Sequence, residues 1–207
     1  MKALLLNGST RKNGCTYVAL AEIAKALERE GIDAEIAQLG GALVRDCLAC
    51  NQCVGKGKCV FSDDIVNEWI KKARTADGFV FGSPVYFAHP SGQLLSAMDR
   101  MFYAGGEAFA HKPAAAVVTA RRAGTTASLD AIQKHFTDAQ MPVVSSTYWN
   151  MVFGPAPELV KQDQEGLQTM RNLAKNMAWL LRCIAAGKGN GIVPPKADTG
   201  HWTNFNL

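Results

Sequence analysis

Residues 8–16 place glycine, hydroxyl, amide and guanidinium groups together, directly after a short apolar run that ends at Asn7. A helical pattern follows at once, so the order is strand, turn, helix. The start of such a helix presents unpaired backbone N–H groups, and its dipole favours an anion. We therefore predict a phosphate-binding loop, with an ordinary surface turn as the alternative. The side chains suited to a phosphate are the hydroxyls of Ser9, Thr10 and Thr16, the amide of Asn13 and the guanidinium of Arg11.

Four cysteines form the second candidate site, in the pattern Cys47-x2-Cys50-x2-Cys53-x5-Cys59. Two-residue spacers in series are typical of a [4Fe–4S] cluster, which needs four thiolates. A structural zinc ion usually draws on two ligand pairs with a longer spacer between them. Free or disulfide-forming thiols without a metal are the third interpretation. Gly55 and Gly57 give the backbone freedom to turn before the last cysteine.

Several classes of function do not fit this chain. No lysine follows the second glycine of the first loop, so the nucleotide-hydrolysing G-x-x-x-x-G-K-[ST] motif is absent, and so is G-x-G-x-x-G. The net charge is +4 without a long basic run, so we expect neither nucleic acid nor a membrane as partner. Lys2 precedes only four apolar residues, too few for a secretion signal. We therefore expect a cytoplasmic protein, in which thiols stay reduced.

The elements that must position these residues alternate between strand and helix. Apolar runs predict strands that end at Asn7 and cover 34–39, 78–81 and 114–119, with a fifth strand beginning at Val143-Val144. Helical spacing predicts helices between them, one of them capped by Ser62-Asp63. The last helix carries an apolar stripe that we expect to face the core, including Ile184, and Cys183 beside it is predicted to be an inert buried thiol. The four histidines have no metal-ligand spacing and receive no role.

This alternation predicts an α/β fold, a doubly wound three-layer domain with a five-stranded parallel sheet. Three strands end in loops rich in Ser, Thr, Gly and Tyr, at 8–16, 82–87 and 120–126. Such ends lie on one side of a parallel sheet, which is the geometry of a mononucleotide pocket. We expect one domain over 1–187, with the cysteine loop 47–59, and a tail over 188–207 that docks on this domain or on a neighbouring subunit, in which Trp202 and Phe205 make the contacts.

Three segments resemble the flavodoxin-like NAD(P)H-dependent FMN reductases: 8–14 (Gly-Ser-Thr-Arg-Lys-Asn-Gly), 83–86 (Ser-Pro-Val-Tyr) and 203–205 (Thr-Asn-Phe). The resemblance implies FMN as the ligand and the flavodoxin-like form of the fold. One departure concerns Cys15, where family members often have Asn. The implied FMN-binding residues are Ser9, Thr10, Arg11, Asn13, Gly14, Cys15 and Thr16 at the phosphate, Ser83, Pro84, Val85, Tyr86 and Phe87 along the isoalloxazine, and Thr119, Arg121 and Gly124 on its other side.

The cysteine pattern is similar to that of the iron–sulfur flavoproteins, a branch of the same group. By this resemblance Cys47, Cys50, Cys53 and Cys59 are the ligands of a [4Fe–4S] cluster, and the chain forms a homodimer or homotetramer. It would be an FMN-dependent oxidoreductase that passes electrons from ferredoxin or NAD(P)H to a small acceptor, with no catalytic side chain because the flavin carries the chemistry. Two alternatives are a cluster-free NAD(P)H-dependent FMN, quinone or azo reductase and a non-enzymatic electron carrier. Carrier flavodoxins are usually strongly acidic, whereas this chain is mildly basic.

Overall fold

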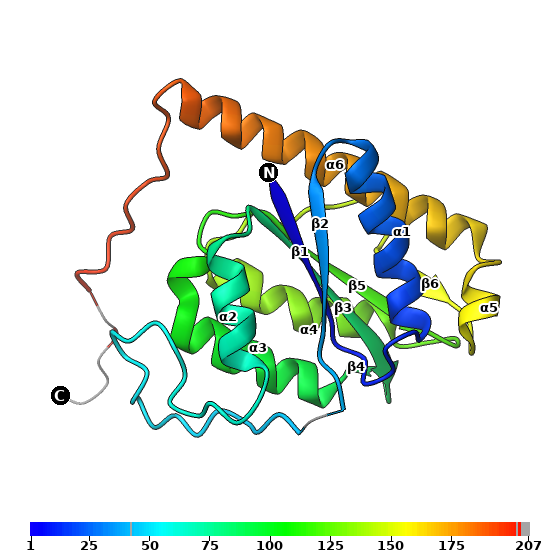
Figure 1. Ribbon diagram of the computed structural model, residues 1–207, viewed down its shortest axis with the longest axis horizontal. Coiled ribbons are helices and arrows are strands. Elements are labelled where there is room, and N and C mark those ends of the chain that lie inside the picture. The colour runs from blue at the N-terminus through cyan, green and yellow to red at the C-terminus, as the bar shows by residue number, and fades with distance from the viewer. Residues whose placement is uncertain (42, 202, 204–207) are drawn as a thin grey trace.

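Five parallel strands in the order β2-β1-β3-β5-β6 form the middle layer of the computed structural model, which describes residues 1–41, 43–201 and 203 (Figure 1). This confirms the predicted five-stranded parallel sheet. A two-residue strand, β4, adds an antiparallel partner to β3. The strand bounds are β1 Lys2–Asn7, β2 Asp33–Gln38, β3 Gly78–Tyr86, β4 His89–Pro90, β5 Ala114–Ala120 and β6 Met151–Phe153.

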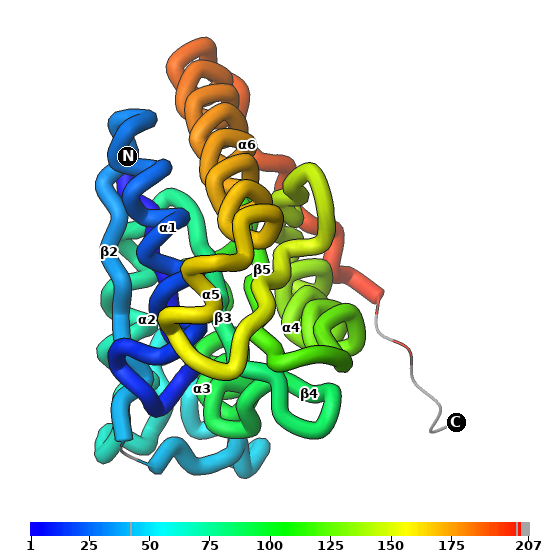
Figure 2. Tube along the Cα trace, turned by 90° about the vertical axis from the view of Figure 1, so that its right-hand side faces the viewer, coloured from blue at the N-terminus to red at the C-terminus, as the bar shows by residue number. Residues whose placement is uncertain are grey.

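Helices cover both faces of this sheet, which gives the three predicted layers (Figures 1 and 2). Side chains alternate along a strand, so Leu4 and Leu6 enter one core while Leu5 enters the other. The first core lies under α2, α3 and α4, and the second lies under α1 and α6. The helix bounds are α1 Cys15–Arg29, α2 Val66–Arg74, α3 Gly92–Gly105, η1 Gly106–Ala108, α4 Thr125–Asp138, α5 Pro157–Val160 and α6 Gln164–Gly189.

The predicted position of the fifth strand is wrong. Val143 forms only an isolated bridge to Ala114 at the start of β5, and regular pairing resumes at Met151 opposite Val118. The amide of Asn150 donates to the Ala116 carbonyl between these two points (3.0 Å). A side chain therefore replaces a backbone partner where the edge strand leaves the sheet.

The predicted cap of α2 is also displaced. The helix begins at Val66, whose N–H donates to the Asp64 carboxylate (3.1 Å), rather than after Ser62-Asp63. Asp64 has a second partner within the cysteine site, described below.

The last helix differs from its prediction near its end. Its stripe is buried up to Leu181, but Ile184 is 39 % exposed and the Cys183 thiol is exposed, so the prediction of a core thiol is wrong. With 26 residues, α6 is about 39 Å long, whereas β1 spans about 20 Å. Its last turns extend past the sheet, as Figure 1 shows.

The chain after α6 runs outside the three layers in both ribbon and tube views (Figures 1 and 2). Every described residue from Gly191 onward is exposed. Trp202 and Phe205, to which we assigned the docking contacts, lie outside the described residues.

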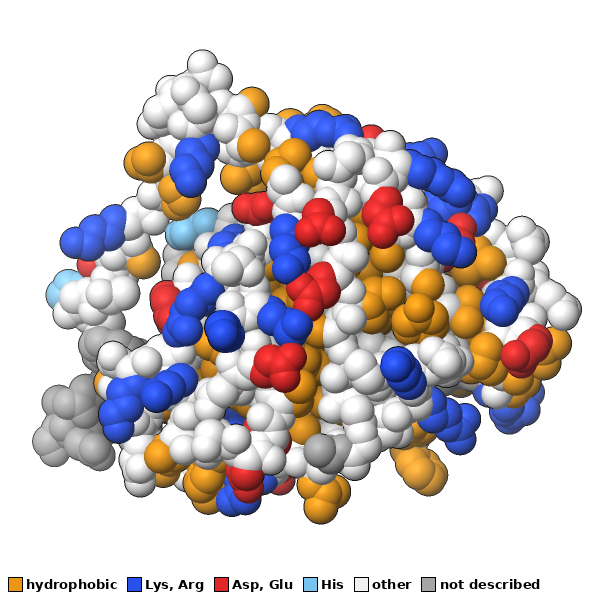
Figure 3. All heavy atoms as spheres, in the orientation of Figure 1, with side chains coloured by type: hydrophobic (Ala, Val, Ile, Leu, Met, Phe, Trp, Pro, Cys, Tyr) orange, Lys and Arg blue, Asp and Glu red, His pale blue; other side chains and the backbone are white. Residues whose placement is uncertain are grey.

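The surface mixes charges of both signs over β2 and α2, as Figure 3 shows for this face. Lys2 and Lys72 both pair with Glu35 there (2.6 and 2.5 Å). Among the described residues, no helix combines the length and apolarity that a membrane crossing requires.

Candidate functional site

The register of the sheet brings the three predicted loops to one edge. Asn7 lies opposite Gly82 across β1 and β3, and Pro84 lies opposite Thr119 across β3 and β5. The predicted segments 8–16, 82–87 and 120–126 therefore meet at the carboxyl edge, where doubly wound sheets bind ligands, although residues 82–86 belong to β3 and the ends of the other two segments belong to neighbouring elements.

The first loop is held by its own polar groups. The Ser9 N–H donates to the Asn7 side chain (3.2 Å), and the Arg11 N–H donates to Ser9 Oγ (3.1 Å). The Gly8 N–H donates to the Gly82 carbonyl (2.8 Å), which fixes the first loop against the second. This hydrogen bonding sets the loop conformation without using the guanidinium of Arg11.

The start of α1 is open to an anion. Gly14 is the N-cap, no side chain accepts a hydrogen bond from the first turn, and that turn contains no acidic residue. The side chains of Thr10, Arg11 and Asn13 around it are exposed. Free N–H groups, a positive helix end and exposed donors are the components of a phosphate site.

Two predicted phosphate ligands turn their side chains elsewhere. The Thr16 hydroxyl is hydrogen-bonded to the Thr119 hydroxyl (3.1 Å), and both residues are buried. The Cys15 thiol donates to the Gly154 carbonyl (3.6 Å), and burial raises its pKa. The side chains at these positions therefore join α1 to β5 and to the segment after β6, which leaves only their backbone N–H groups for a phosphate.

The second loop forms a tight hairpin with β4. The Ser91 N–H donates to Ser83 Oγ and the Ser83 hydroxyl donates to the Pro84 carbonyl (both 2.8 Å), so Ser83 ties the end of β3 to the start of α3. Phe87 and Ala88 at its tip have positive φ (49° and 62°), and Phe87 is fully exposed. Non-glycine residues in this conformation store strain, a feature that gathers at ligand-binding positions.

The third loop lies directly against the second. Gly124 has φ 90°, and a Cβ built on it would lie only 2.5 Å from the Cα of Ala88. Only glycine permits this approach, which brings the predicted isoalloxazine-lining segments together. Arg121 in the same loop is exposed.

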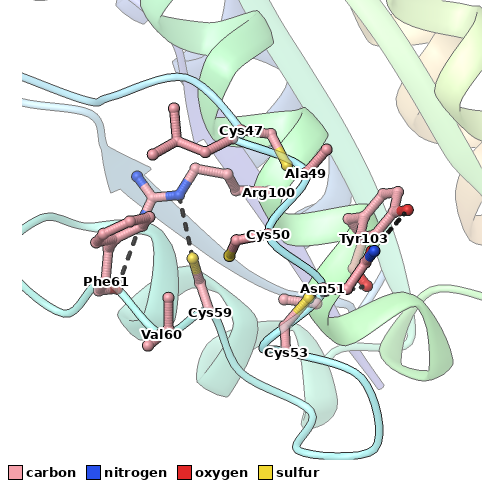
Figure 4. Close-up of a pocket in the computed structure, with 12 residues that line it drawn as sticks. Cys47, Ala49, Cys50, Asn51, Cys53, Cys59, Val60, Phe61, Arg100 and Tyr103 are labelled. Carbon is pink, nitrogen blue, oxygen red and sulfur yellow. Dashed lines mark hydrogen bonds between the residues drawn. The ribbon is translucent and has the colours of Figure 1, made fainter.

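The four cysteines of the pattern line one cavity, together with Phe61, Arg100 and Tyr103 (Figure 4). The loop that carries them bends at four positions with positive φ, namely Ala49, Asn51, Gly55 and Gly57. All six cysteines are free. Within the described part of the chain, no three His, Cys, Asp or Glu side chains are grouped closely enough to hold a single metal ion.

Cys59 is the most firmly held of the four. Its N–H donates to the Asn67 side chain (2.8 Å), and the Asn67 amide donates to the Cys59 carbonyl (3.0 Å). Arg100 Nε donates to its sulfur (3.3 Å). Burial lowers the pKa of Arg100, but the hydrogen bonds to Asp64 and Cys59 outweigh this, so the pKa is raised overall.

Neither Arg100 nor Asn67 was among the predicted site residues. An available signal was the position of Arg100 between Met98 and Met101 on an otherwise apolar helix face, because a buried arginine needs polar partners. Its partners, however, could not be named from the sequence.

A model of the NADPH-dependent FMN reductase family matches residues 1–156. The chain belongs to this family. This FMN reductase family member is therefore an FMN-dependent oxidoreductase. An iron–sulfur flavoprotein of Methanocaldococcus jannaschii is 36 % identical over 192 residues, covering 89 % of this chain and 99 % of that protein. One of Methanosarcina thermophila is 30 % identical over 191 residues, covering 89 % and 97 %.

Solved structures similar to this family member establish the flavodoxin-like fold. A flavone reductase superposes with a TM-score of 0.68 at 17 % identity, over 89 % of this chain and 64 % of that one. An archaeal flavodoxin gives 0.61 at 15 % identity, over 88 % and 99 %. The apo form of an NADH:FMN oxidoreductase gives 0.62 at 17 % identity, over 86 % and 89 %.

Proposed function

We propose that this FMN reductase family member passes electrons between a reduced donor, ferredoxin or NAD(P)H, and a small acceptor, through FMN and a [4Fe–4S] cluster. The observation that carries the proposal is that all four cysteines of the sequence pattern line one cavity (Figure 4). The names of the relatives, iron–sulfur flavoproteins, support the same conclusion. We further propose that it works in the cytoplasm as a homodimer or homotetramer.

The FMN phosphate is proposed to bind at the start of α1. The first-turn N–H groups there are free of side-chain caps, and Thr10, Arg11 and Asn13 are exposed beside them. A doubly charged phosphate suits this end of the helix dipole, and the Arg11 guanidinium adds a charge-assisted hydrogen bond. These residues fix one end of the cofactor and thereby the position of the rest.

The isoalloxazine is proposed to lie between the second and third loops. Tyr86 and Phe87 offer exposed aromatic faces, and the contact of Gly124 with Ala88 keeps the two loops at a fixed distance. When bound, the flavin supplies transfer of one or two electrons. The second and third loops would hold the ring, with their backbone N–H groups as hydrogen-bond donors.

The cysteine loop fits a cluster in its donor set and in its backbone. Four thiols approach one cavity, and the left-handed residues Ala49 and Asn51 flank Cys50, so the chain turns sharply on both sides of it. The N–H···S bond from Arg100 to Cys59 suits a sulfur that carries negative charge. Single electrons are what such a cluster exchanges.

A larger cavity adjoins the cysteine site and offers a route for the small acceptor. It shares Cys47, Ala49 and Tyr103 with the cysteine cavity, has a volume of about 590 Å³ and is also lined by Phe102 and His135. This volume lies within the usual range for small-molecule sites, and its aromatic lining suits a planar compound.

The test is anaerobic purification followed by absorbance spectroscopy and analysis of flavin, iron and acid-labile sulfide. We expect about one FMN and about four iron and four sulfide per chain. Reduction by NAD(P)H or reduced ferredoxin, followed by steady turnover with a quinone or an azo dye, establishes the activity.

Three variants test which residues bind the FMN phosphate and which bind the cluster. Arg11→Gln should weaken FMN binding at least about tenfold in a fluorescence titration, because it removes a charge-assisted hydrogen bond. Arg29→Gln, at the opposite end of α1, is the matched control and should leave the affinity unchanged. Cys50→Ser should lose the cluster and keep FMN.

The two alternatives predict different results. FMN present with iron and sulfide near zero in fresh anaerobic protein contradicts the cluster and leaves a two-electron reductase. Reduction of FMN without any turnover identifies an electron carrier.

A further inference from the structure

Arg100 is a buried cation at the cysteine cavity, and its role there goes beyond supplying a ligand. Its side chain comes from α3 and is 1 % exposed, and its ion-pair partner Asp64 is 2 % exposed. A buried charge is retained only with partners that replace water. The partners of Arg100 show what it holds in place.

One guanidinium contacts both ends of the cysteine loop, and Figure 4 shows its contacts with Cys59 and Phe61. Before the loop, Nη1 donates to the Arg45 carbonyl (3.2 Å). After the loop, Nη2 donates to the Phe61 carbonyl (3.3 Å), and at its last cysteine Nε donates to Cys59 Sγ (3.3 Å). The Asp64 carboxylate accepts from Nη1 and Nη2 and fixes the plane of the guanidinium.

We propose that Arg100 is a positioning residue that closes the cysteine loop before any metal binds and, through its N–H···S hydrogen bond to Cys59, raises the reduction potential of the cluster. The first part is a property of the chain alone. The second rests on the proposed function, because it requires the cluster.

The effect on the potential follows from charge. Reduction adds an electron to a centre whose negative charge spreads onto the cysteine sulfurs, so a donor aimed at one sulfur stabilises the reduced form more than the oxidised form. The Arg100 guanidinium is hydrogen-bonded to Cys59 Sγ, whereas the Asp64 carboxylate contacts the guanidinium and not the sulfur. The positive charge is therefore the nearer of the two to the sulfur.

The test variant changes both members of the buried pair, because Arg100 alone cannot be removed without leaving Asp64 buried and unpaired. Arg100→Met with Asp64→Asn keeps the net charge, and the introduced amide retains an oxygen for the Val66 N–H. The matched control is Arg74→Gln. Arg74 donates to the Gly57 carbonyl of the same loop and pairs with Glu107 (3.2 Å), but it contacts no cysteine.

The first measurement is amide hydrogen exchange on the metal-free protein. We expect exchange of the hydrogen-bonded amides within 45–64, those of Val54, Lys56 and Cys59, to accelerate at least tenfold in the double variant, with β1 and β3 unchanged. Arg74→Gln should affect only the residues next to Gly57. Exchange of 45–64 at the wild-type rate in a folded double variant overturns the closing role, whether or not iron is ever bound.

The second measurement is a redox titration of the reconstituted proteins, followed by electron paramagnetic resonance. At a fixed potential, the ratio of oxidised to reduced cluster should rise about tenfold in the double variant, equivalent to a midpoint about 59 mV lower. An unchanged or higher midpoint in a variant with full iron content overturns the tuning role. A wild-type protein that never takes up iron contradicts the proposed cluster and leaves the exchange result to decide on the closing role.

Discussion

At the scale of single residues, burial separates the two cysteines that lie outside the cysteine loop. The Cys15 thiol donates to the Gly154 carbonyl and burial raises its pKa, whereas Cys183 is exposed at the overhanging end of α6. Only the thiolate reacts, so the raised pKa and the partial burial of Cys15 both slow its reaction. At pH 8 we expect iodoacetamide to modify Cys183 at least about tenfold faster than Cys15 in the apoprotein, measured by peptide mass spectrometry. Equal rates would show that the start of α1 opens readily.

The residues that could be predicted at the site are those whose signal is local in the sequence. The spacing of the four cysteines within thirteen residues was sufficient to place them at one cavity. Arg100 is separated from Cys59 by 41 positions, and its partners are two backbone carbonyls, a sulfur and a carboxylate. Backbone carbonyls carry no sequence signal, so this contact required the fold.

At the scale of elements, Glu35 joins β1, β2 and α2 by accepting from both Lys2 and Lys72. These hydrogen bonds, that of Lys2 first, lower its pKa below 4.5. A lowered carboxyl pKa stabilises the fold above the unfolded-state value, and this stabilisation is lost as the pH falls through the folded-state value. Glu35→Gln should therefore lower the free energy of unfolding by about 0.5–1 kcal/mol at pH 7.

Urea denaturation of the Glu35→Gln variant at pH 7 and at pH 3 measures this contribution. The difference from wild type should be smaller at pH 3 than at pH 7, because the carboxyl is protonated below pH 4.5 in the unfolded chain and at lower pH in the folded protein. Glu28→Gln, at an exposed position of α1, is the control and should differ little at either pH. A difference as large at pH 3 as at pH 7 would assign the loss to packing rather than to charge.

The contact of Gly124 with Ala88 determines the spacing of the second and third loops. Gly124→Ala requires a Cβ within 2.5 Å of the Ala88 Cα at φ 90°, so the loops must separate. We expect a loss of about 1–3 kcal/mol in the free energy of unfolding and weaker FMN binding. Gly189→Ala, with open space around it at the end of α6, should be neutral. Unchanged FMN affinity in the Gly124 variant would place the isoalloxazine elsewhere.

Strands covered on both faces were predicted most reliably, because a short continuous apolar run such as that of β5 is typical of a strand buried between two layers of helices. The edge strand was misplaced for a physical reason. Val143 and Val144 are apolar and do meet β5 at Ala114, but the polar residues 145–147 follow and the pairing lapses. It resumes at Met151 only after the Asn150 side chain has satisfied the Ala116 carbonyl. Because the pairing with β5 is interrupted after Val144 and a side chain takes one of its places, the sequence of this edge strand shows no alternation of apolar and polar residues.

At the scale of the whole molecule, the last turns of α6 and the tail remain outside the three layers (Figures 1 and 2). Ile184, Ile192 and Val193 are 39, 69 and 74 % exposed, so these apolar side chains gain little from their own domain. A segment of this composition is stabilised when it packs on another surface, and a second copy of the chain is always available for that purpose. The docking of the tail over 188–207 stays a prediction, in which the tail would determine the number of subunits.

Removing residues 191–207 tests whether the tail joins subunits, because it should weaken the oligomer without changing the stability of the folded monomer. The described tail residues are exposed, so the truncated chain should unfold at nearly the same urea concentration as the full chain when both are monomeric at high dilution. The proposed homo-oligomer should dissociate at a protein concentration at least about tenfold higher in the truncated chain than in the full chain, measured by size-exclusion chromatography with light scattering. Ile192→Ser with Val193→Ser is a milder variant that should shift dissociation in the same direction. Truncation that leaves the oligomer intact would assign subunit contacts to the body of the molecule instead.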